Sequence, residues 1–303
     1  MGIVIETKGL TKRYKSGAGC FNIDLQVPQG CVFGLLGSNG AGKSTLVKTL
    51  VGLLRATSGQ ATVLGKPLGT VAVRKRIGYL PESFRYQPWM TGIELLDFHA
   101  RLRHVPAEVA RRRIPELLEM VNLRGKGDHP IKSYSKGMQQ RLGLAAALIA
   151  DPELVFLDEP TSALDPVGRR QARELIIRLR EQGKTIFLNS HLLGEVESVC
   201  DQIAVLNSGQ LVAMGSLSEL RGIQVVLDLR VTGISDTVKS ELSKLAMGIT
   251  QVGDRMTMVV REPGVIPLVA QLITNSGARL YELVPRSRDL EELFFDLVQN
   301  GGC

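Results

Sequence analysis

The stretch that most restricts the fold is a glycine-rich turn that ends in a lysine and two hydroxyl residues. It reads Gly37-Ser38-Asn39-Gly40-Ala41-Gly42-Lys43-Ser44-Thr45. Apolar residues 32–36 precede it as a predicted strand, and residues 46–51 follow it as a predicted helix. Glycines let successive N–H groups converge on phosphate oxygens, and the start of a helix adds partial positive charge. The pattern predicts a phosphate-binding loop in which Lys43 reaches the outer phosphates and the Ser44 hydroxyl ligates Mg²⁺.

A pair of acidic residues ends a second apolar strand. Asp158 and Glu159 directly follow Leu154-Val155-Phe156-Leu157. Open α/β sheets bind their ligands at the carboxyl ends of the strands, so we expect Asp158 to hold Mg²⁺ through water. Hydrolysis of a γ-phosphate requires a positioned water, and Glu159 is predicted to polarise it. With the glycine-rich turn upstream, the pair predicts hydrolysis of a nucleoside triphosphate.

Charge and cysteine content narrow the class of protein only in part. The formal net charge of +7, from 37 Lys and Arg against 30 Asp and Glu, suits nucleotides, nucleic acid or an anionic membrane face equally well. The four cysteines are scattered without a Cys-x-x-Cys pair, which predicts reduced thiols in a cytosolic protein. They are Cys20, Cys31, Cys200 and Cys303.

Two further patterns concern the membrane. The N-terminal residues lack the basic and long apolar segments of a signal peptide. The longest apolar run, Leu142 to Ala150, is far shorter than the roughly 20 residues that a spanning helix needs. We therefore expect the chain to be soluble on its own and to reach a membrane only through a partner.

Hydrophobic periodicity predicts an α/β domain over residues 1–220. The predicted strands are residues 3–10, 21–27, 32–36, 61–65, 77–82, 154–157 and 185–188, followed by a hairpin over 203–213. Helical spacing predominates over residues 90–150, which predicts a mostly helical insertion. A helix over 168–182 connects two continuous apolar strands as a βαβ crossover, which is typical of strands buried on both faces.

The periodicity changes again after residue 222, and we expect a second domain over residues 221–303. The predicted order is strand 225–231, helix 235–246, strands 249–252 and 255–261, helix 263–276 and strand 279–284, with a last helix over 290–299. This β-α-β-β-α-β order predicts a small α+β sandwich of the split-βαβ type.

Five motifs in a fixed order resemble the nucleotide-binding subunit of an ATP-binding-cassette (ABC) transporter. They are residues 37–45, Tyr134-Ser135-Lys136-Gly137-Met138-Gln139-Gln140-Arg141, Leu157-Asp158-Glu159-Pro160, Ser162-Ala163-Leu164-Asp165 and Ser190-His191. The resemblance covers about residues 1–220. It implies an ATPase with the P-loop NTPase fold: a RecA-like core, an antiparallel β-subdomain and a helical subdomain.

The resemblance also implies roles for single residues. Tyr14 resembles the aromatic residue that stacks on adenine, and Lys43, Glu159 and His191 resemble the catalytic set, with His191 contacting the γ-phosphate. Ser135, Gly137, Gln139 and Asp165 resemble residues that meet the ATP bound by a second subunit. Two chains paired head to tail, as a homodimer or with a paralogue, would then enclose two ATP molecules, close with ATP and open after hydrolysis.

The chain departs from the family pattern at two places. The usual signature, Leu-Ser-Gly-Gly-Gln, is replaced by residues 134–138, but Ser135 and Gly137 remain, so we expect phosphate binding to survive. Glu82 stands where the family has a glutamine, and we expect its carboxylate to ligate Mg²⁺ when ATP is bound. The Leu80-Pro81-Glu82 form, together with the extension after residue 220, resembles the branch that pairs with separate six-helix permeases and mostly exports.

This branch implies a position at the cytoplasmic face of the cell membrane, held there by an integral membrane permease. The aromatic stretch at residues 83–90, which contains Trp89, is predicted to form part of the groove that receives a permease helix. A buried hinge between subdomains is the alternative for this stretch. For the whole chain, the alternative is a soluble cassette ATPase that acts on the ribosome or in DNA repair. The chain has a single cassette, whereas ribosome-acting proteins usually have two, and it has no heptad run of the kind found in repair proteins. Both observations favour the transporter, and we expect no nucleic-acid partner.

Overall fold

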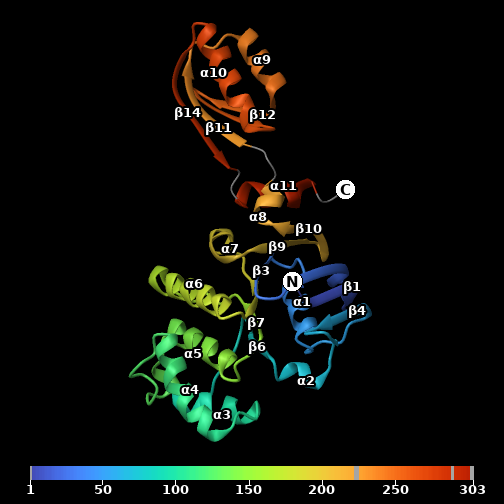
Figure 1. Cartoon of the computed structure of the whole chain (residues 1–303), viewed down its shortest axis with the longest axis vertical. Coiled ribbons are helices and arrows are strands. Elements are labelled where there is room, and N and C mark those ends of the chain that lie inside the picture. Colours follow the sequence, from blue (N-terminus) through green and yellow to red (C-terminus); the bar gives the residue numbers. More distant parts are fainter. Residues whose placement is uncertain (1, 222–224, 288–289, 301–303) are drawn as a thin grey trace. The chain divides into compact units, whose positions relative to one another are not determined.

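The computed structural model describes residues 2–221, 225–287 and 290–300, and it divides into two compact units (Figure 1). The first unit comprises Met1–Ser216 with Leu297–Cys303, and the second comprises Leu217–Asp296. Each unit has its own core of buried apolar side chains, and the residues expected to bind nucleotide belong to the first.

A six-stranded sheet forms the centre of the first unit, in the order β10-β9-β3-β8-β7-β6. The strands are β3 (Val32–Gly37), β6 (Ile77–Leu80), β7 (Leu154–Asp158), β8 (Thr185–Asn189), β9 (Gln202–Asn207) and β10 (Gln210–Ser216). Five strands are parallel, and β9 and β10 form the predicted antiparallel hairpin. Every residue of β3, β7 and β8 is buried, as expected for strands covered on both faces.

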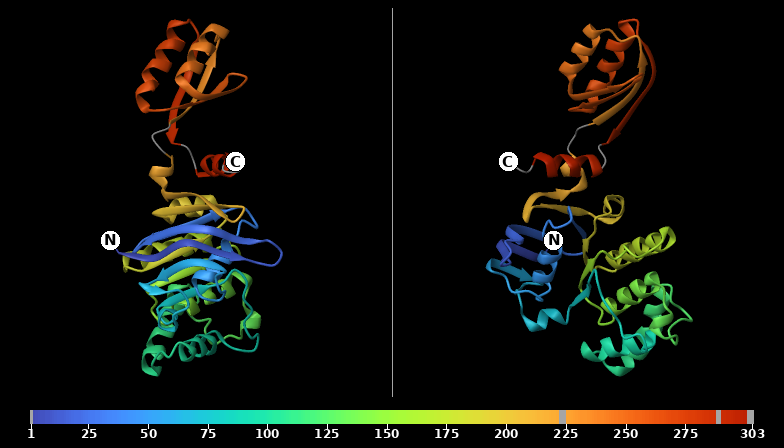
Figure 2. Two further views of the ribbon diagram at one scale, coloured as in Figure 1. Left: turned by 90° about the vertical axis from the view of Figure 1, so that its right-hand side faces the viewer. Right: turned by 180° about the vertical axis from the view of Figure 1, so that it is seen from behind.

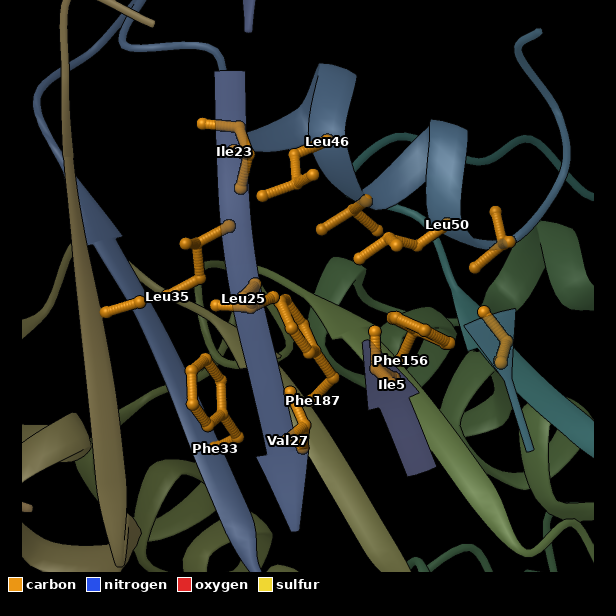
Figure 3. Close-up of a cluster of buried hydrophobic side chains, with 14 of the residues drawn as sticks. Ile5, Ile23, Leu25, Val27, Phe33, Leu35, Leu46, Leu50, Phe156 and Phe187 are labelled. Atoms are coloured by element: carbon orange, nitrogen blue, oxygen red, sulfur yellow. The ribbon is translucent and has the colours of Figure 1, made fainter. Parts of the chain in front are cut away.

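A second, antiparallel sheet packs against this core, in part through one helix. Its order is β2-β1-β4-β5, from β1 (Ile3–Arg13), β2 (Gly19–Pro28), β4 (Ser58–Val63) and β5 (Lys66–Pro67). Helix α1 (Lys43–Leu50) buries Leu46 and Leu50 in the cluster that joins the two sheets (Figure 3). The start of α1, and with it the glycine-rich turn, is therefore held from both sides by apolar packing.

Aromatic stacking fixes the strands below this helix. Phe187 of β8 lies with its ring centroid 5.4 Å from that of Phe33 on β3 and 5.2 Å from that of Phe156 on β7. All three side chains are fully buried. Because each belongs to a different neighbouring strand, their packing sets how the three strand ends line up (Figure 3).

The predicted helical insertion is confirmed. It contains α3 (Gly92–Leu102), α4 (Ala107–Met120), the 3₁₀ turn η1 (Ile131–Ser133) and α5 (Lys136–Leu148), which lie together in Figure 1. Helix α3 begins at a capping box, in which the Thr91 hydroxyl accepts from the Glu94 N–H and the Glu94 carboxylate accepts from the Thr91 N–H. Helix α6 (Pro166–Glu181) begins two residues before the predicted 168, because Asp165 caps it.

Four short elements were not predicted: β5, α2 (Val71–Arg74), α7 (Leu193–Val199) and α8 (Leu217–Arg221). Each spans only two to seven residues. Segments of this length complete at most two helical turns, so hydrophobic periodicity carries little signal over them.

The second unit has the predicted β-α-β-β-α-β order (Figure 2). Its elements are β11 (Val225–Thr232), α9 (Asp236–Leu245), β12 (Ala246–Val252), β13 (Arg255–Val260), η2 (Pro263–Val265), α10 (Ile266–Asn275) and β14 (Arg279–Ser287). Helix α11 (Leu290–Asn300) begins in this unit, and its residues from Leu297 on belong to the first unit. The sheet order is β12-β13-β11-β14, and all neighbours are antiparallel. Both α9 and α10 bury apolar side chains in a core with strand residues such as Leu229 and Met258.

Two other expectations can be compared with the described part of the chain. Cys20, Cys31 and Cys200 are free thiols, and Cys303 lies outside the described residues. Within residues 2–221, 225–287 and 290–300, none of the helices combines the length and the apolar character needed to cross a bilayer.

Replacing Phe187 by alanine tests the aromatic stack. Phe187→Ala removes a fully buried ring and leaves a cavity, so we expect the free energy of unfolding to fall by about 3–5 kcal/mol. Urea unfolding followed by circular dichroism measures the change. Phe98→Ala, at a ring that is 49 % exposed, is the matched control and should cost much less. Equal losses for both variants would contradict the stacking argument.

Candidate nucleotide-binding site

The glycine-rich turn joins the end of β3 to the start of α1. Gly40 and Gly42 have φ angles of 83° and 96°, in the left-handed region that favours glycine. A Cβ atom at Gly42 would lie 2.4 Å from the carbonyl oxygen of Gly19. Glycine is therefore required here for both its conformation and its lack of a side chain, and the turn leads directly into the N-terminus of α1 at Lys43.

Lys43 folds back over this turn. Its Nζ donates to the carbonyl oxygens of Gly37 at 2.9 Å and Ser38 at 3.1 Å. Burial lowers the pKa of Lys43 below its ordinary value, because desolvation disfavours the ammonium form. Three nearby carboxylates act in the opposite direction and raise this pKa: Glu159, Asp158 and Glu82. The structure thus brings the predicted lysine into the field of all three predicted acidic residues.

Asp158 is fully buried at the end of β7. One carboxylate oxygen, Oδ1, accepts from Nδ2 of Asn189, the residue paired with Asp158 across β7 and β8. Burial raises the pKa of Asp158, and the hydrogen bond from Asn189 partly offsets this shift. Asn189 was missed by the sequence reasoning, although its position at the end of an apolar strand, beside Ser190-His191, was a usable signal.

Glu159 adopts an unusual backbone conformation, with a φ of 54°. Its N–H donates to the carbonyl oxygen of Asn189 at 2.8 Å, and its Oε2 lies 2.8 Å from Nδ1 of His191. Burial raises the pKa of the Glu159 carboxyl, and the hydrogen bond with His191 opposes the rise. A carboxylate whose pKa is raised accepts a proton more readily, as a group that polarises water must do.

A cavity of 390 Å³ lies where these residues meet. It is lined by Ala18, Gly19, Asn39, Gly40, Ala41, Gly42, Lys43, Ser44, Thr45, Glu82, Glu159 and Asn189. The glycine-rich turn, Glu82 and Glu159, which are far apart in the sequence, therefore share one cavity. Ala18 and Gly19 are further residues that the sequence reasoning missed.

Tyr14 does not line this cavity. Its side chain is 39 % exposed, and the Lys12 Nζ lies 5.5 Å from the ring centroid. Tyr14 begins the turn between β1 and β2, whereas Ala18 and Gly19 at the other end of the turn do line the cavity. The predicted adenine-stacking residue is thus close in sequence to the cavity wall, and its ring is partly exposed.

The predicted signature residues form the start of α5 instead. The Ser135 hydroxyl accepts from the Met138 N–H at 3.2 Å as the helix cap, and the Gln139 amide donates to the Tyr134 carbonyl at 3.3 Å. Gly137 lies in the first turn of the helix, which begins at Lys136, before the apolar run that starts at Leu142. Gln139 lines a separate cavity of 600 Å³, together with Glu82 and Lys136.

Asp165 caps a helix in the same way. Its Oδ1 accepts from the Gly168 N–H at 2.8 Å, which satisfies a free N–H group at the start of α6. Both the signature segment and Asp165 thus lie outside the cavity that the glycine-rich turn forms in the same chain.

Comparison with known proteins agrees with this geometry. The sequence profile described as "ABC transporter" matches residues 20–162. An ABC transporter ATP-binding protein of Nostoc, described as uncharacterised, is 49 % identical over 73 % of this chain and 69 % of its own length. The Nod factor export ATP-binding protein I of Cupriavidus pinatubonensis is 36 % identical over 97 % of this chain and 90 % of its own length. The daunorubicin resistance ATP-binding protein DrrA3 of Streptomyces coeruleorubidus is 35 % identical over 97 % and 95 %.

Solved structures give the same result. The ATP-binding subunit of an ABC transporter superposes with a TM-score of 0.67 at 29 % identity, over 72 % of this chain and 92 % of that one. A dimeric ATP-binding cassette bound to ADP and Pi superposes with a TM-score of 0.64 at 26 % identity, over 71 % and 99 %. With the P-loop NTPase fold and the cavity described above, these matches show that the chain belongs to the ABC transporter family, as an ATP-binding subunit with ATPase activity.

Proposed function

We propose that the 390 Å³ cavity binds ATP with Mg²⁺ and that Glu159 polarises the water that attacks the γ-phosphate. The observation that carries this proposal is the convergence of the glycine-rich turn, Lys43 and Glu159 on one cavity. The N–H groups of the turn and the start of α1 suit phosphate oxygens, and Lys43 adds a positive charge beside them. His191 holds the Glu159 carboxylate through the 2.8 Å contact and reaches the γ-phosphate from its half-exposed ring.

The residues at the strand ends fit a divalent cation. Among the described residues, Oδ2 of Asp158 and Oδ1 of Asn189 are buried oxygen atoms without a hydrogen-bond partner. Carboxylate, amide and hydroxyl oxygens are the ligands that Mg²⁺ prefers, so Asp158, Glu82 and the Ser44 hydroxyl would hold it, directly or through water. When bound, Mg²⁺ supplies positive charge that neutralises the phosphates.

A second ATP-binding subunit completes the proposed site. Ser135, Gly137, Gln139 and Asp165 lie outside the cavity of their own chain, and the N-terminus of α5 suits an anion. Each chain then offers two phosphate-binding surfaces, and head-to-tail pairing brings the signature surface of one chain to the ATP of the other. The dimeric state of the similar cassette with ADP and Pi supports this arrangement.

An apolar cavity supports docking of a permease helix. The cavity has a volume of 330 Å³ and is lined by Leu53, Val71 and Leu102, whose side chains are 63 %, 68 % and 60 % exposed. Arg74, Lys75 and Arg103 also line it, and the described lining residues include no Asp or Glu. Exposed apolar side chains rimmed by charge are typical of interaction sites. We therefore propose that a cytosolic helix with apolar and acidic side chains binds here.

Within the aromatic stretch at residues 83–90, different residues support the two predicted roles. The rings of Phe84 and Tyr86 lie 4.8 Å apart, and Tyr86 meets His99 of α3 edge-on, as a hinge between subdomains would require. Trp89 is 72 % exposed, as a docking residue would require. None of residues 83–90 lines the apolar cavity. We propose that Trp89 extends the docking surface beyond the cavity.

We propose that the transporter works as an exporter, with this chain at the cytoplasmic face of the membrane. The names of two relatives that match 97 % of this chain support the direction: one concerns Nod factor export and the other daunorubicin resistance. No observation favours the alternative of a cassette that acts on the ribosome or on nucleic acid.

Replacing Glu159 by glutamine tests the proposed hydrolysis. Glu159→Gln keeps the shape of the side chain and removes its ability to accept a proton, so we expect ATP binding to persist and kcat to fall roughly 10²–10³-fold. A phosphate-release assay measures kcat, and size-exclusion chromatography with ATP should show a trapped dimer. Glu108→Gln, at an exposed residue of α4 that pairs with the exposed Arg111, serves as control. Hydrolysis at the wild-type rate by Glu159→Gln would refute the role.

The role of Glu82 can be separated from that of Glu159 by titrating Mg²⁺. Glu82→Gln keeps an oxygen ligand, so we expect its ATPase activity to stay within a few-fold of wild type. Glu82→Ala removes the ligand and should raise the Mg²⁺ concentration for half-maximal ATPase and uncouple hydrolysis from transport. If the Mg²⁺ curve of Glu82→Ala overlays that of the wild type and transport is intact, Glu82 is a solvated carboxylate without a metal role.

Docking is tested by co-purification with the membrane subunit. Trp89→Ala and Leu102→Ala each remove exposed apolar surface, so we expect less membrane subunit on an affinity-tagged chain while ATP binding is unchanged. Ile3→Ala, at an exposed residue of β1, is the control and should assemble normally. Lost ATP binding with intact assembly in Trp89→Ala would instead assign residues 83–90 to a hinge.

A further inference from the structure

The conformation of Glu159 requires support from its neighbours. A φ of 54° is costly for a residue with a Cβ atom, and such conformations persist only where surrounding contacts hold them. The N–H of Glu159 is held by Asn189. Its carbonyl oxygen accepts from the Ser162 hydroxyl at 3.1 Å, from the Ser162 N–H at 3.4 Å and from Nε2 of Gln140 at 3.1 Å. The two residues that donate to this carbonyl, Ser162 and Gln140, belong to different parts of the chain.

Ser162 belongs to the same loop as Glu159, whereas Gln140 belongs to another element. Gln140 lies on α5, 19 residues earlier in the chain, and its side chain is only 3 % exposed. The helix that carries it begins at the signature segment, where Ser135 is the cap. The amide of Gln140 therefore provides a long-range hydrogen bond between the loop of Glu159 and the helical part of the unit.

We propose that Gln140 is a positioning residue for ATP hydrolysis. Its amide N–H holds the carbonyl of Glu159 and so keeps the backbone in the left-handed conformation that directs the Glu159 carboxylate into the cavity. Gln140 lies one helical turn beyond Gly137 on α5. A shift of the N-terminus of α5, which carries Ser135 and Gly137, therefore also moves the Gln140 amide that donates to Glu159. The inference rests on the proposed role of Glu159, and it adds a link between the signature helix and the catalytic carboxylate of the same chain.

A purely structural role for Gln140 leads to different expectations. If Gln140 only fills space, an apolar side chain of the same length should preserve kcat, and any loss of activity should follow the loss of thermal stability. If it positions Glu159, losing the donor should lower kcat while the KM for ATP stays unchanged, because no group that contacts ATP is altered. The Ser162 hydroxyl still satisfies the carbonyl, so the fold should survive.

The first experiment uses Gln140→Met in the full chain. We expect kcat to fall roughly tenfold, with the KM for ATP within about twofold of wild type. Thr7→Val is the matched control: its hydroxyl donates to the Ile23 carbonyl and accepts from the Leu25 N–H, both buried, and it does not line the cavity, so its loss should lower the melting temperature without lowering kcat. Wild-type kcat in Gln140→Met, or a kcat loss in Thr7→Val that matches its loss of stability, would overturn the proposal.

The second experiment uses Gln140→Glu and pH. A carboxylate cannot donate to the carbonyl of Glu159, but a protonated carboxyl can, and burial raises the pKa of such a group. We expect the ratio of its kcat to that of the wild type to rise as the pH falls from about 8 to about 6, while the ratio for Gln140→Met stays flat. Identical pH profiles for the two variants would overturn the proposal. If Glu159→Gln keeps full activity, the proposed role of Glu159 is wrong. If Glu159→Gln loses activity and Gln140→Met does not, only the proposed role of Gln140 is wrong.

Discussion

The parallel alignment of three buried strands is the constraint on which the nucleotide site depends. The glycine-rich turn leaves the end of β3, Asn189 ends β8 and Asp158 ends β7, and these strands are direct neighbours. Parallel strands end at the same edge of a sheet, so residues more than a hundred positions apart in the sequence meet there. The apolar interiors of the strands hold this alignment, because Phe33, Phe156 and Phe187 stack across them.

The same packing places carboxylates out of contact with water at the strand ends, which destabilises their charged forms. Asp158 and Glu159 are removed from water, so burial raises the pKa of both, and Glu82 adds a third carboxylate nearby. The basic side chains that act on them include Lys43 and His191 at Glu159 and Lys48 at Asp158. A site with this balance is stabilised further by a cation, and its two unpartnered buried oxygens provide ligands for one.

Helix α5 links three regions of the first unit. Its first turn carries the signature residues, its next turn carries Gln140 against Glu159, and Gly143 then approaches the aromatic stretch. A Cβ atom at Gly143 would lie 3.0 Å from the Tyr86 hydroxyl oxygen, so the close contact depends on glycine. Because a helix moves as a rigid body, a displacement at the aromatic stretch or at the signature would reach the backbone of Glu159 through a single element.

Local sequence patterns determined much of this protein. Apolar periodicity predicted the helical insertion and the element order of the small unit. The glycine-rich turn and the acidic pair at the end of β7 were recognised from combinations of residue types that are uncommon outside phosphate-binding sites. Tertiary structure alone decided the roles of Asn189 and Gln140, and the separation of the apolar cavity from residues 83–90. These depend on which strands are neighbours and which helix covers them. Periodicity shows which face of an element is buried, but it does not show what the element is buried against.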